Sequence, residues 1–180
     1  AGITEHLDVL GGYDWLRAQP ETAGQPVGLM GFSLGGATAA IAFSEEPEIA
    51  ALWSDSAYGN LRKTIELELE TQYGIPGFLA RSSETWGQLV GYDITAINPE
   101  DGFGDNRNGR PVFLVHGTED TRIDVAFANE LALLVQATDP AFEPWVIDGI
   151  GHTAALFERT DDYTGHMVSF FEEALGANGS

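Results

Sequence analysis

The segment that most constrains the fold is PVGLMGFSLGGA at residues 26–37, where an apolar run ends in a serine between two glycines. Val27–Phe32 is short and almost wholly apolar, which predicts a strand that is buried on both faces. Leu34–Phe43 consists mainly of small and apolar residues, which predicts a helix that packs closely on a sheet. The chain must therefore turn sharply from a buried strand into a helix at Ser33.

The rest of the chain repeats this alternation of apolar strands and helices. Further strands are predicted at 49–54, 111–116 and 142–147. Helices are predicted at 3–19, 60–72, 76–89, 122–137 and 164–175, and the turn-rich segments 20–26 and 98–110 are predicted loops. The pattern indicates an α/β fold in which a parallel sheet of about four strands has helices on both faces. In such sheets the functional site lies at the carboxyl ends of the strands.

The length and composition indicate one globular domain over residues 1–180. The chain has 43% hydrophobic residues and no cysteine, which excludes disulfides and thiolate metal sites. We expect no cofactor and no metal, because the H-E-x-x-H, Walker A and G-x-G-x-x-G motifs are absent. We expect no membrane association, because no apolar run approaches the ~20 residues that span a bilayer. Without a recognisable signal segment, the localisation stays open and the cytoplasm is favoured.

The charge balance narrows the choice of partners. The chain has 28 acidic and 8 basic residues, a formal net charge of −20, and Lys63 is its only lysine. Nucleic acids and anionic membranes both require positive charge, so neither is expected as a partner. Two interpretations of the acidity stay open, a self-repelling surface that favours solubility and an adaptation to high salt.

The first candidate functional residue is Ser33, which lies within the G-x-S-x-G pattern Gly31–Gly35. After a strand and before a helix, this pattern is typical of a nucleophile elbow, in which a strained turn exposes the serine oxygen. Side chains at positions 31 and 35 are expected to collide with the neighbouring strand or helix. The alternative is a glycine-rich turn in which the serine caps the helix.

The second candidate is Asp120, in the sequence His116-Gly117-Thr118-Glu119-Asp120 after the third strand. A carboxylate at this edge can orient an imidazole, although a turn or helix-capping role for Asp120 is an alternative. His116 is expected to pack beneath the turn. Glu119 and Asp124 are expected to face solvent.

The third candidate is His152, which follows the fourth strand in a glycine-rich loop and is predicted to be a general base. His6 and His166 fall within predicted helices and are weaker candidates. Asp55, directly after the second strand, is the alternative acid.

Ser33, Asp120 and His152 occur in the chain order of the α/β-hydrolases. The segments GFSLGG, VFLVHGTED and GIGHT resemble the second half of an α/β-hydrolase. Together with WSDSAYGNL after the second strand, they are similar to the prolyl-oligopeptidase-like and small-esterase branch, and the resemblance spans about residues 3–175.

The resemblance implies a serine hydrolase that cleaves small-molecule carboxylic esters through an acyl-enzyme. In this interpretation Ser33 is the nucleophile, His152 the base and Asp120 the acid, and the backbone N–H of Leu34 is one oxyanion donor. A serine peptidase is an alternative. So is a catalytically weak hydrolase fragment that acts as a binding or assembly module.

Residues 56–110 lie where the family carries a cap over the pocket. The apolar residues of this segment either line an acyl site or pack the cap on the sheet; they are Tyr58, Leu61, Tyr73, Phe78, Leu79, Trp86 and Leu89.

One departure from the family pattern concerns the N-terminal side of the elbow. Only 32 residues precede Ser33, so the strands that family members place there, and the loop that supplies the second oxyanion N–H, are not expected in this chain. We therefore expect a bare edge on the Val27–Phe32 strand. Self-association, pairing with a missing N-terminal segment, or a rearranged sheet would each cover that edge. Loss of one oxyanion donor would lower the rate by ~10²–10³.

Overall fold

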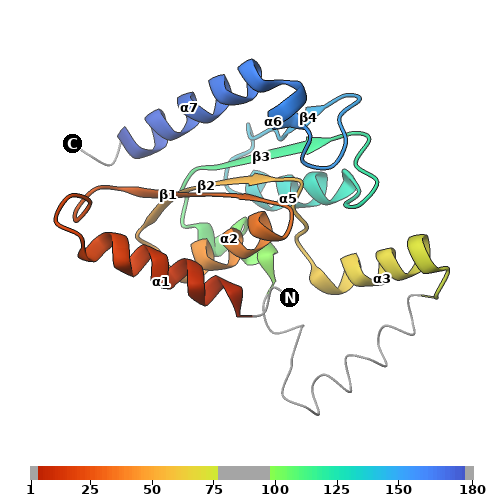
Figure 1. The fold of residues 1–180 in the computed structure, drawn as a ribbon, viewed down its shortest axis with the longest axis horizontal. Coiled ribbons are helices and arrows are strands. Elements are labelled where there is room, and N and C mark those ends of the chain that lie inside the picture. Colours follow the sequence, from red (N-terminus) through yellow and green to blue (C-terminus); the bar gives the residue numbers. More distant parts are fainter. Residues whose placement is uncertain (1–3, 77–97, 177–180) are drawn as a thin grey trace, which may run out of the picture.

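The computed structural model describes residues 4–76 and 98–176, and within them four parallel strands form one sheet in the order β1-β2-β3-β4 (Figure 1). The strands are β1 (Val27–Phe32), β2 (Ile49–Asp55), β3 (Val112–Gly117) and β4 (Trp145–Ile147). Phe32 pairs with Asp55, and Asp55 in turn pairs with Val115. Because these strands end in register, the residues that follow them meet at one edge of the sheet. The predicted α/β class is confirmed.

Helices cover both faces of the sheet. The structure contains α1 (Glu5–Ala18), α2 (Leu34–Glu45), α3 (Leu61–Tyr73), α5 (Ala126–Gln136), α6 (Ala155–Glu158) and α7 (Thr160–Gly176), with short 3-10 turns at Pro99–Gly102 and Asp105–Arg107. In Figure 1, α7 lies above the sheet, while α1, α2 and α5 lie below it. The sequence alternation therefore predicted the layering correctly.

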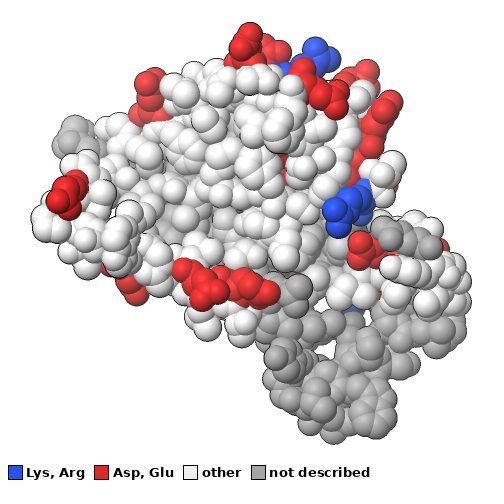
Figure 2. All heavy atoms as spheres, viewed as in Figure 1, with Lys and Arg blue, Asp and Glu red and all other residues white. Residues whose placement is uncertain are grey.

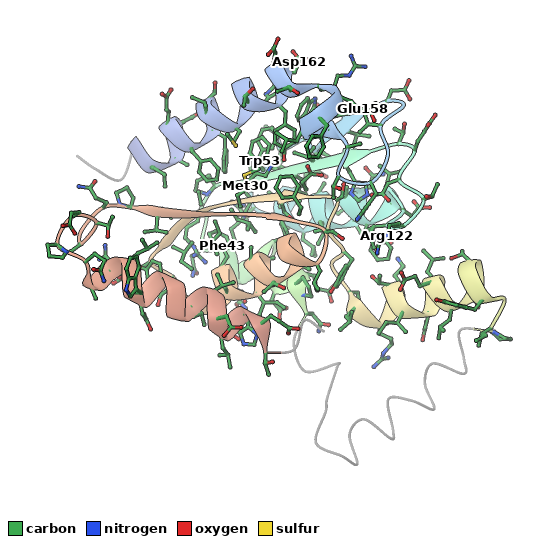
Figure 3. All side chains as sticks on the ribbon, in the orientation of Figure 1. Met30, Phe43, Trp53, Arg122, Glu158 and Asp162 are labelled. Atoms are coloured by element: carbon green, nitrogen blue, oxygen red, sulfur yellow. The ribbon has the colours of Figure 1, made fainter. Side chains whose placement is uncertain are left out.

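Each face of the sheet has its own hydrophobic core, because successive side chains of a strand point to opposite faces. Leu52 packs with Phe43, Leu114 and Leu131 on the side of α2 and α5. The next residue, Trp53, packs with residues of α7 on the other side. Figure 3 shows Trp53 and Phe43 on opposite sides of the strands. All seven residues of β2 are buried, which fits a central strand covered on both faces.

Three boundaries differ from the sequence predictions by three residues or more. Helix α5 begins at Ala126 and not at Arg122, because the Asp120 carboxylate accepts the N–H groups of Arg122 and Ile123 in a turn. Strand β4 begins at Trp145, after Pro144, which has no N–H to donate to a ladder.

The closing helix also begins earlier than predicted, at Thr160, and the short helix α6 precedes it. The predicted helix at 76–89 lies almost entirely outside the described residues. Residues 77–97 of the predicted cap-like insertion at 56–110 also lie outside the described residues, and the insertion stays a prediction.

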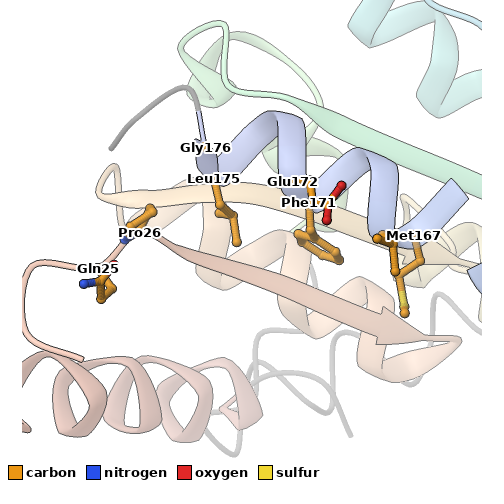
Figure 4. Close-up of a pocket in the computed structure, with 8 residues that line it drawn as sticks. Gln25, Pro26, Met167, Phe171, Glu172, Leu175 and Gly176 are labelled. Carbon is orange, nitrogen blue, oxygen red and sulfur yellow. The ribbon is translucent and has the colours of Figure 1, made fainter. Parts of the chain in front are cut away.

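Strand β1 has one unpaired edge among the described residues, because its only neighbour there is β2. Met30 in this strand is exposed, as expected for a sheet edge. A groove of about 780 Å³ lies between the start of β1 and α7, and Figure 4 shows Pro26, Met167, Phe171 and Leu175 along it. The expectation of a bare edge is therefore confirmed for the part of the chain that the structure describes.

Acidic side chains dominate the charged surface. Figure 2 shows Asp and Glu around the margin of the visible face, separated by uncharged surface, with few Lys or Arg among them. In the described ranges, no helix is both long and apolar enough to cross a bilayer.

Candidate active site

Ser33 lies in a strained turn between β1 and α2. Its backbone has φ 52° and ψ −121°, a conformation that non-glycine residues rarely adopt and that clusters at functional sites. The Ser33 N–H donates to the Asp55 carbonyl at 2.8 Å, which fixes the turn to the end of β2. A Cβ atom at Gly31 would lie 2.3 Å from the Gly35 carbonyl oxygen, so only glycine fits there. These features match the elbow that the sequence predicts.

The steric prediction for Gly35 is wrong. A Cβ atom at Gly35 meets no described atom within 4 Å, whereas one at Gly36 would lie 2.9 Å from Ser54 Oγ and 3.0 Å from the Gly31 carbonyl oxygen. The close approach of α2 to the sheet therefore occurs at Gly36.

His152 follows β4 and bridges the other two candidate residues. Its Nε2 lies 2.9 Å from Ser33 Oγ, and its Nδ1 lies 2.7 Å from Asp120 Oδ2. An ionised carboxylate only accepts hydrogen bonds, so Nδ1 carries the proton and Nε2 is free to accept the Ser33 proton. The structure thus brings together the three residues that sequence reasoning singled out, from loops after three different strands.

The loops that carry Asp120 and His152 are in backbone contact. The Glu119 N–H donates to the Ile150 carbonyl at 2.9 Å. A Cβ atom at Gly117 would lie 2.0 Å from that carbonyl oxygen, so the glycine at the end of β3 allows the two loops to meet. This approach sets the spacing between the carboxylate and the imidazole.

Asp120 is held as an anion by several donors. Its side chain has no exposed surface, and burial alone would raise its pKa. Hydrogen bonds from His116, from the Ile123 and Arg122 N–H groups and from His152 outweigh that effect and lower the pKa of Asp120 to about 2. The Asp120 carboxylate is therefore ionised at neutral pH and can accept the proton that His152 carries on Nδ1.

His116 packs beneath the Asp120 turn, as predicted, and also contacts the carboxylate. Its Nε2 lies 2.8 Å from the Ile123 carbonyl oxygen and 3.3 Å from Asp120 Oδ2, so one N–H faces two acceptors. Glu119 and Asp124 are exposed, in agreement with the sequence prediction.

The weaker histidine candidates lie elsewhere. His6 is buried in α1, 3.5 Å from the Glu45 carboxylate, and His166 on α7 packs against Phe113 and Trp145.

Among the described residues, Asp55, the alternative acid, has hydrogen bonds to hydroxyl groups and none to a histidine. Its Oδ1 accepts from Ser56 Oγ at 2.8 Å, and its Oδ2 accepts from the Tyr163 hydroxyl at 2.9 Å. Ser56, Tyr163 and Thr153, whose N–H donates to Ser56 Oγ, were not singled out by sequence reasoning. Only the structure draws attention to them, because Ser56 and Thr153 both have positive φ angles there.

The N-terminal turn of α2 faces the same edge of the sheet. Leu34 is the first residue of α2, so its N–H is one of the groups that have no acceptor within the helix. Next to α2, Tyr58 and Leu61 pack with Phe127 and Ile123, and Tyr73 at the end of α3 is exposed. Phe78, Leu79, Trp86 and Leu89 lie outside the described residues.

Groups of His, Cys, Asp and Glu side chains are the usual ligands of a metal ion in a protein. Over residues 4–76 and 98–176, no group of three or more of them is arranged to hold a metal ion.

Comparison with known proteins gives the context for this geometry. A model of the prolyl oligopeptidase family matches residues 1–178. The chain belongs to the prolyl oligopeptidase family. A search of curated proteins finds no match.

Three solved structures show how widely this fold is used. An esterase from Pyrococcus furiosus has a TM-score of 0.73 and 25% identity, over 97% of this chain and 63% of its own. An acylaminoacyl peptidase from Pyrococcus horikoshii has a TM-score of 0.67 and 19% identity, over 97% of this chain and 28% of its own. A puromycin-hydrolyzing peptidase from Mycobacterium tuberculosis has a TM-score of 0.69 and 18% identity, over 97% of this chain and 26% of its own.

The chain thus spans less than two thirds of each of these structures. Its α/β-hydrolase fold, resembling the C-terminal portion of such enzymes, is established.

Proposed function

We propose that this chain carries the catalytic residues of a serine hydrolase that cleaves carboxylic esters. The observation that carries the proposal is the hydrogen-bonded series from Ser33 Oγ through His152 to Asp120, with distances of 2.9 and 2.7 Å. The strained Ser33 backbone is the second support, because such strain clusters at catalytic positions.

The mechanism follows from the direction of these hydrogen bonds. Ser33 Oγ attacks the ester carbonyl while His152 Nε2 takes its proton, and the Leu34 N–H stabilises the oxyanion. The C–O bond to the alcohol then breaks, and His152 returns the proton to the leaving oxygen. Water, deprotonated by the same imidazole, releases the acid and regenerates Ser33. Asp120 holds the Nδ1–H tautomer and stabilises the imidazolium during both steps.

Ester cleavage is favoured over peptide cleavage by the comparison with solved structures. The esterase from P. furiosus is 25% identical to this chain, whereas the two peptidases are 19% and 18% identical. A serine peptidase is the second candidate, because the family model is that of a peptidase family.

Replacement of Ser33 tests the proposal. Ser33→Ala is expected to lower kcat for p-nitrophenyl acetate by about 10⁶-fold with an unchanged circular dichroism spectrum. Ser54→Ala is a matched control, because its buried hydroxyl has no hydrogen-bond partner among the described residues. A peptide anilide assayed in parallel separates esterase from peptidase. Full activity in Ser33→Ala would refute the assignment, and an inactive wild-type protein would favour a binding or assembly module.

We also propose that a strand from outside residues 1–180 of the same protein pairs with the free edge of β1. The unpaired edge, the exposed Met30 and the apolar groove beside α7 support this arrangement. An additional segment would also be the source of a second oxyanion donor.

Hydrogen exchange tests the strand-pairing proposal. In the natural full-length protein, the β1 amides that point away from β2 are expected to exchange slowly. In a protein made of residues 1–180 alone they are expected to exchange fast. Equal, fast exchange of these amides in both proteins would contradict the proposal. Slow exchange in a protein whose native mass is that of two chains would instead show that a second copy pairs with the edge.

A further inference from the structure

Two buried residues at the carboxyl end of β2 have no part in the proposed triad. Asp55 and Ser56 are each only 1% exposed, and they lie between the turn that carries Ser33 and the loop that carries His152. A buried carboxylate is costly unless it is hydrogen-bonded, so its partners indicate what it does. Those partners are the hydroxyls of Ser56 and Tyr163.

The direction of each hydrogen bond is fixed by the groups at the ends of the network. Trp53 Nε1–H donates to the Tyr163 hydroxyl at 2.8 Å, and the Thr153 N–H donates to Ser56 Oγ at 3.1 Å. Neither nitrogen can accept a hydrogen bond. Each hydroxyl therefore accepts from a nitrogen and gives its own proton to Asp55, which accepts at both oxygens as an ionised carboxylate.

This arrangement turns a lone pair of Ser56 Oγ toward the backbone of the residue next to His152. Ser56 and Thr153 have φ angles of 53° and 54°, a region that non-glycine residues seldom occupy. Such strain persists only where the surroundings impose it. The hydrogen bond between these two residues joins the loop after β2 to the loop after β4, across 97 positions in the sequence.

We propose that Asp55 and Ser56 are positioning residues for the imidazole: the Asp55 carboxylate orients the Ser56 hydroxyl, which holds the Thr153 N–H and with it the His152 loop. This inference rests on the proposed function. It differs from the role considered for Asp55 in the sequence, because Asp55 acts through the backbone of the loop and not on the imidazole ring.

Ser56→Ala in the intact protein tests the proposal, with Ser54→Ala as its control. Both serines are 1% exposed and two residues apart, and the same hydroxyl is removed, but Ser54 Oγ has no hydrogen-bond partner in the described part of the chain. We expect Ser56→Ala to lower kcat by about 3- to 10-fold with an unchanged KM, the rate equivalent of one hydrogen bond. The control is expected to retain the wild-type kcat.

Labelling by a fluorophosphonate probe separates positioning from stability. Where urea unfolding shows that essentially all of a variant is folded, its labelling rate constant reports the reactivity of the folded protein, so a loss of stability alone leaves the wild-type value. Ser56→Gly removes the hydroxyl but relieves the positive φ, and it is expected to lose the same factor in labelling rate as Ser56→Ala. The NMR resonance of the His152 Nδ1 proton is expected to shift in both variants and not in the control.

Three outcomes separate the possibilities. Wild-type labelling rates in Ser56→Ala and Ser56→Gly would overturn the positioning role. An unchanged His152 Nδ1 resonance in both variants would do so as well, and this readout applies even if no substrate is found. Failure of the wild-type protein to hydrolyse esters or to react with the probe would refute the proposed function instead.

Discussion

Asp55 and Asp120 are two buried carboxylates at the carboxyl ends of neighbouring strands, yet their surroundings move their pKa values in opposite directions. Burial raises the pKa of Asp55, and hydrogen bonds from Ser56 and Tyr163 only partly offset that effect. Burial acts on Asp120 in the same sense, but four hydrogen-bond donors outweigh it and lower the pKa to about 2.

The difference lies in the number and kind of the donors. Asp55 receives two neutral hydroxyls, whereas Asp120 receives two backbone N–H groups and contacts from two imidazoles. Backbone N–H groups in a tight turn are already fixed in place, so they stabilise an anion without further ordering. Burial at a strand end therefore does not distinguish the two carboxylates, and the contact with His152 is what supports Asp120 as the proposed catalytic acid.

The largest expected contrast between the two carboxylates is in catalysis. Asp120→Asn is expected to lower kcat for p-nitrophenyl acetate by about 10⁴-fold, because an amide favours the imidazole tautomer that cannot accept the Ser33 proton. Asp55→Asn is expected to lower it by roughly tenfold, because it weakens only the support of the loop. Steady-state kinetics of the two variants, checked for folding by circular dichroism, give the comparison. A reversed order would assign the catalytic acid to Asp55.

The next contrast concerns the hydrogen bond from the Tyr163 hydroxyl to Asp55 Oδ2. Tyr163→Phe leaves Asp55 Oδ2 and Trp53 Nε1 without their present partner, at a cost of about 1–3 kcal/mol for each buried group. The free energy of unfolding, measured in urea, is expected to fall accordingly. The matched control is Ser169→Ala, which also removes one hydroxyl from α7 but at an exposed position, and it is expected to change the free energy of unfolding by less than about 0.5 kcal/mol. Equal stability of Tyr163→Phe and wild type would show that the network is not needed to hold Asp55.

The smallest contrast is in the pH dependence of stability. Since the pKa of Asp120 is about 2 in the folded protein and ordinarily 3.8, its ionisation stabilises the fold by about 2 kcal/mol above pH 3.8, and this is lost as the pH falls through about 2. The pKa of Asp55 is raised, so its ionisation reduces stability as the pH rises above 3.8.

Urea titrations from pH 2 to 7 check these signs. The stability difference between wild type and Asp120→Asn is expected to grow with rising pH, and that between wild type and Asp55→Asn is expected to shrink. Parallel curves for the two variants would contradict the comparison.

The sequence was sufficient where a local pattern decides the structure. An apolar run that ends in Gly31-Phe32-Ser33 predicts both the bounds of β1 and the strained turn, because the glycine is required by backbone contacts within a few residues. Asp120 and His152 were predicted from their places after parallel strands, whose carboxyl ends meet at one edge, and the structure places both side chains beside Ser33.

The sequence was insufficient where contacts between residues far apart in the chain determine the structure. The Asp55–Tyr163 hydrogen bond joins residues 108 positions apart, and no local pattern marks it. The start of α5 was misplaced because the residues from Arg122 onward have helical character, while the Asp120 carboxylate holds their N–H groups in a turn. The steric prediction at Gly35 failed because the crowded glycine is Gly36, whose neighbour Ser54 belongs to the next strand and is not part of the local motif.

The most direct test of the central claim is to find which residue a fluorophosphonate probe modifies in the intact protein, by mass spectrometry of its peptides. The account predicts a single adduct on Ser33, formed at the wild-type rate in Ser54→Ala, and strongly slowed in Asp120→Asn. An adduct on another serine, or no adduct on Ser33 in folded wild-type protein, would contradict it.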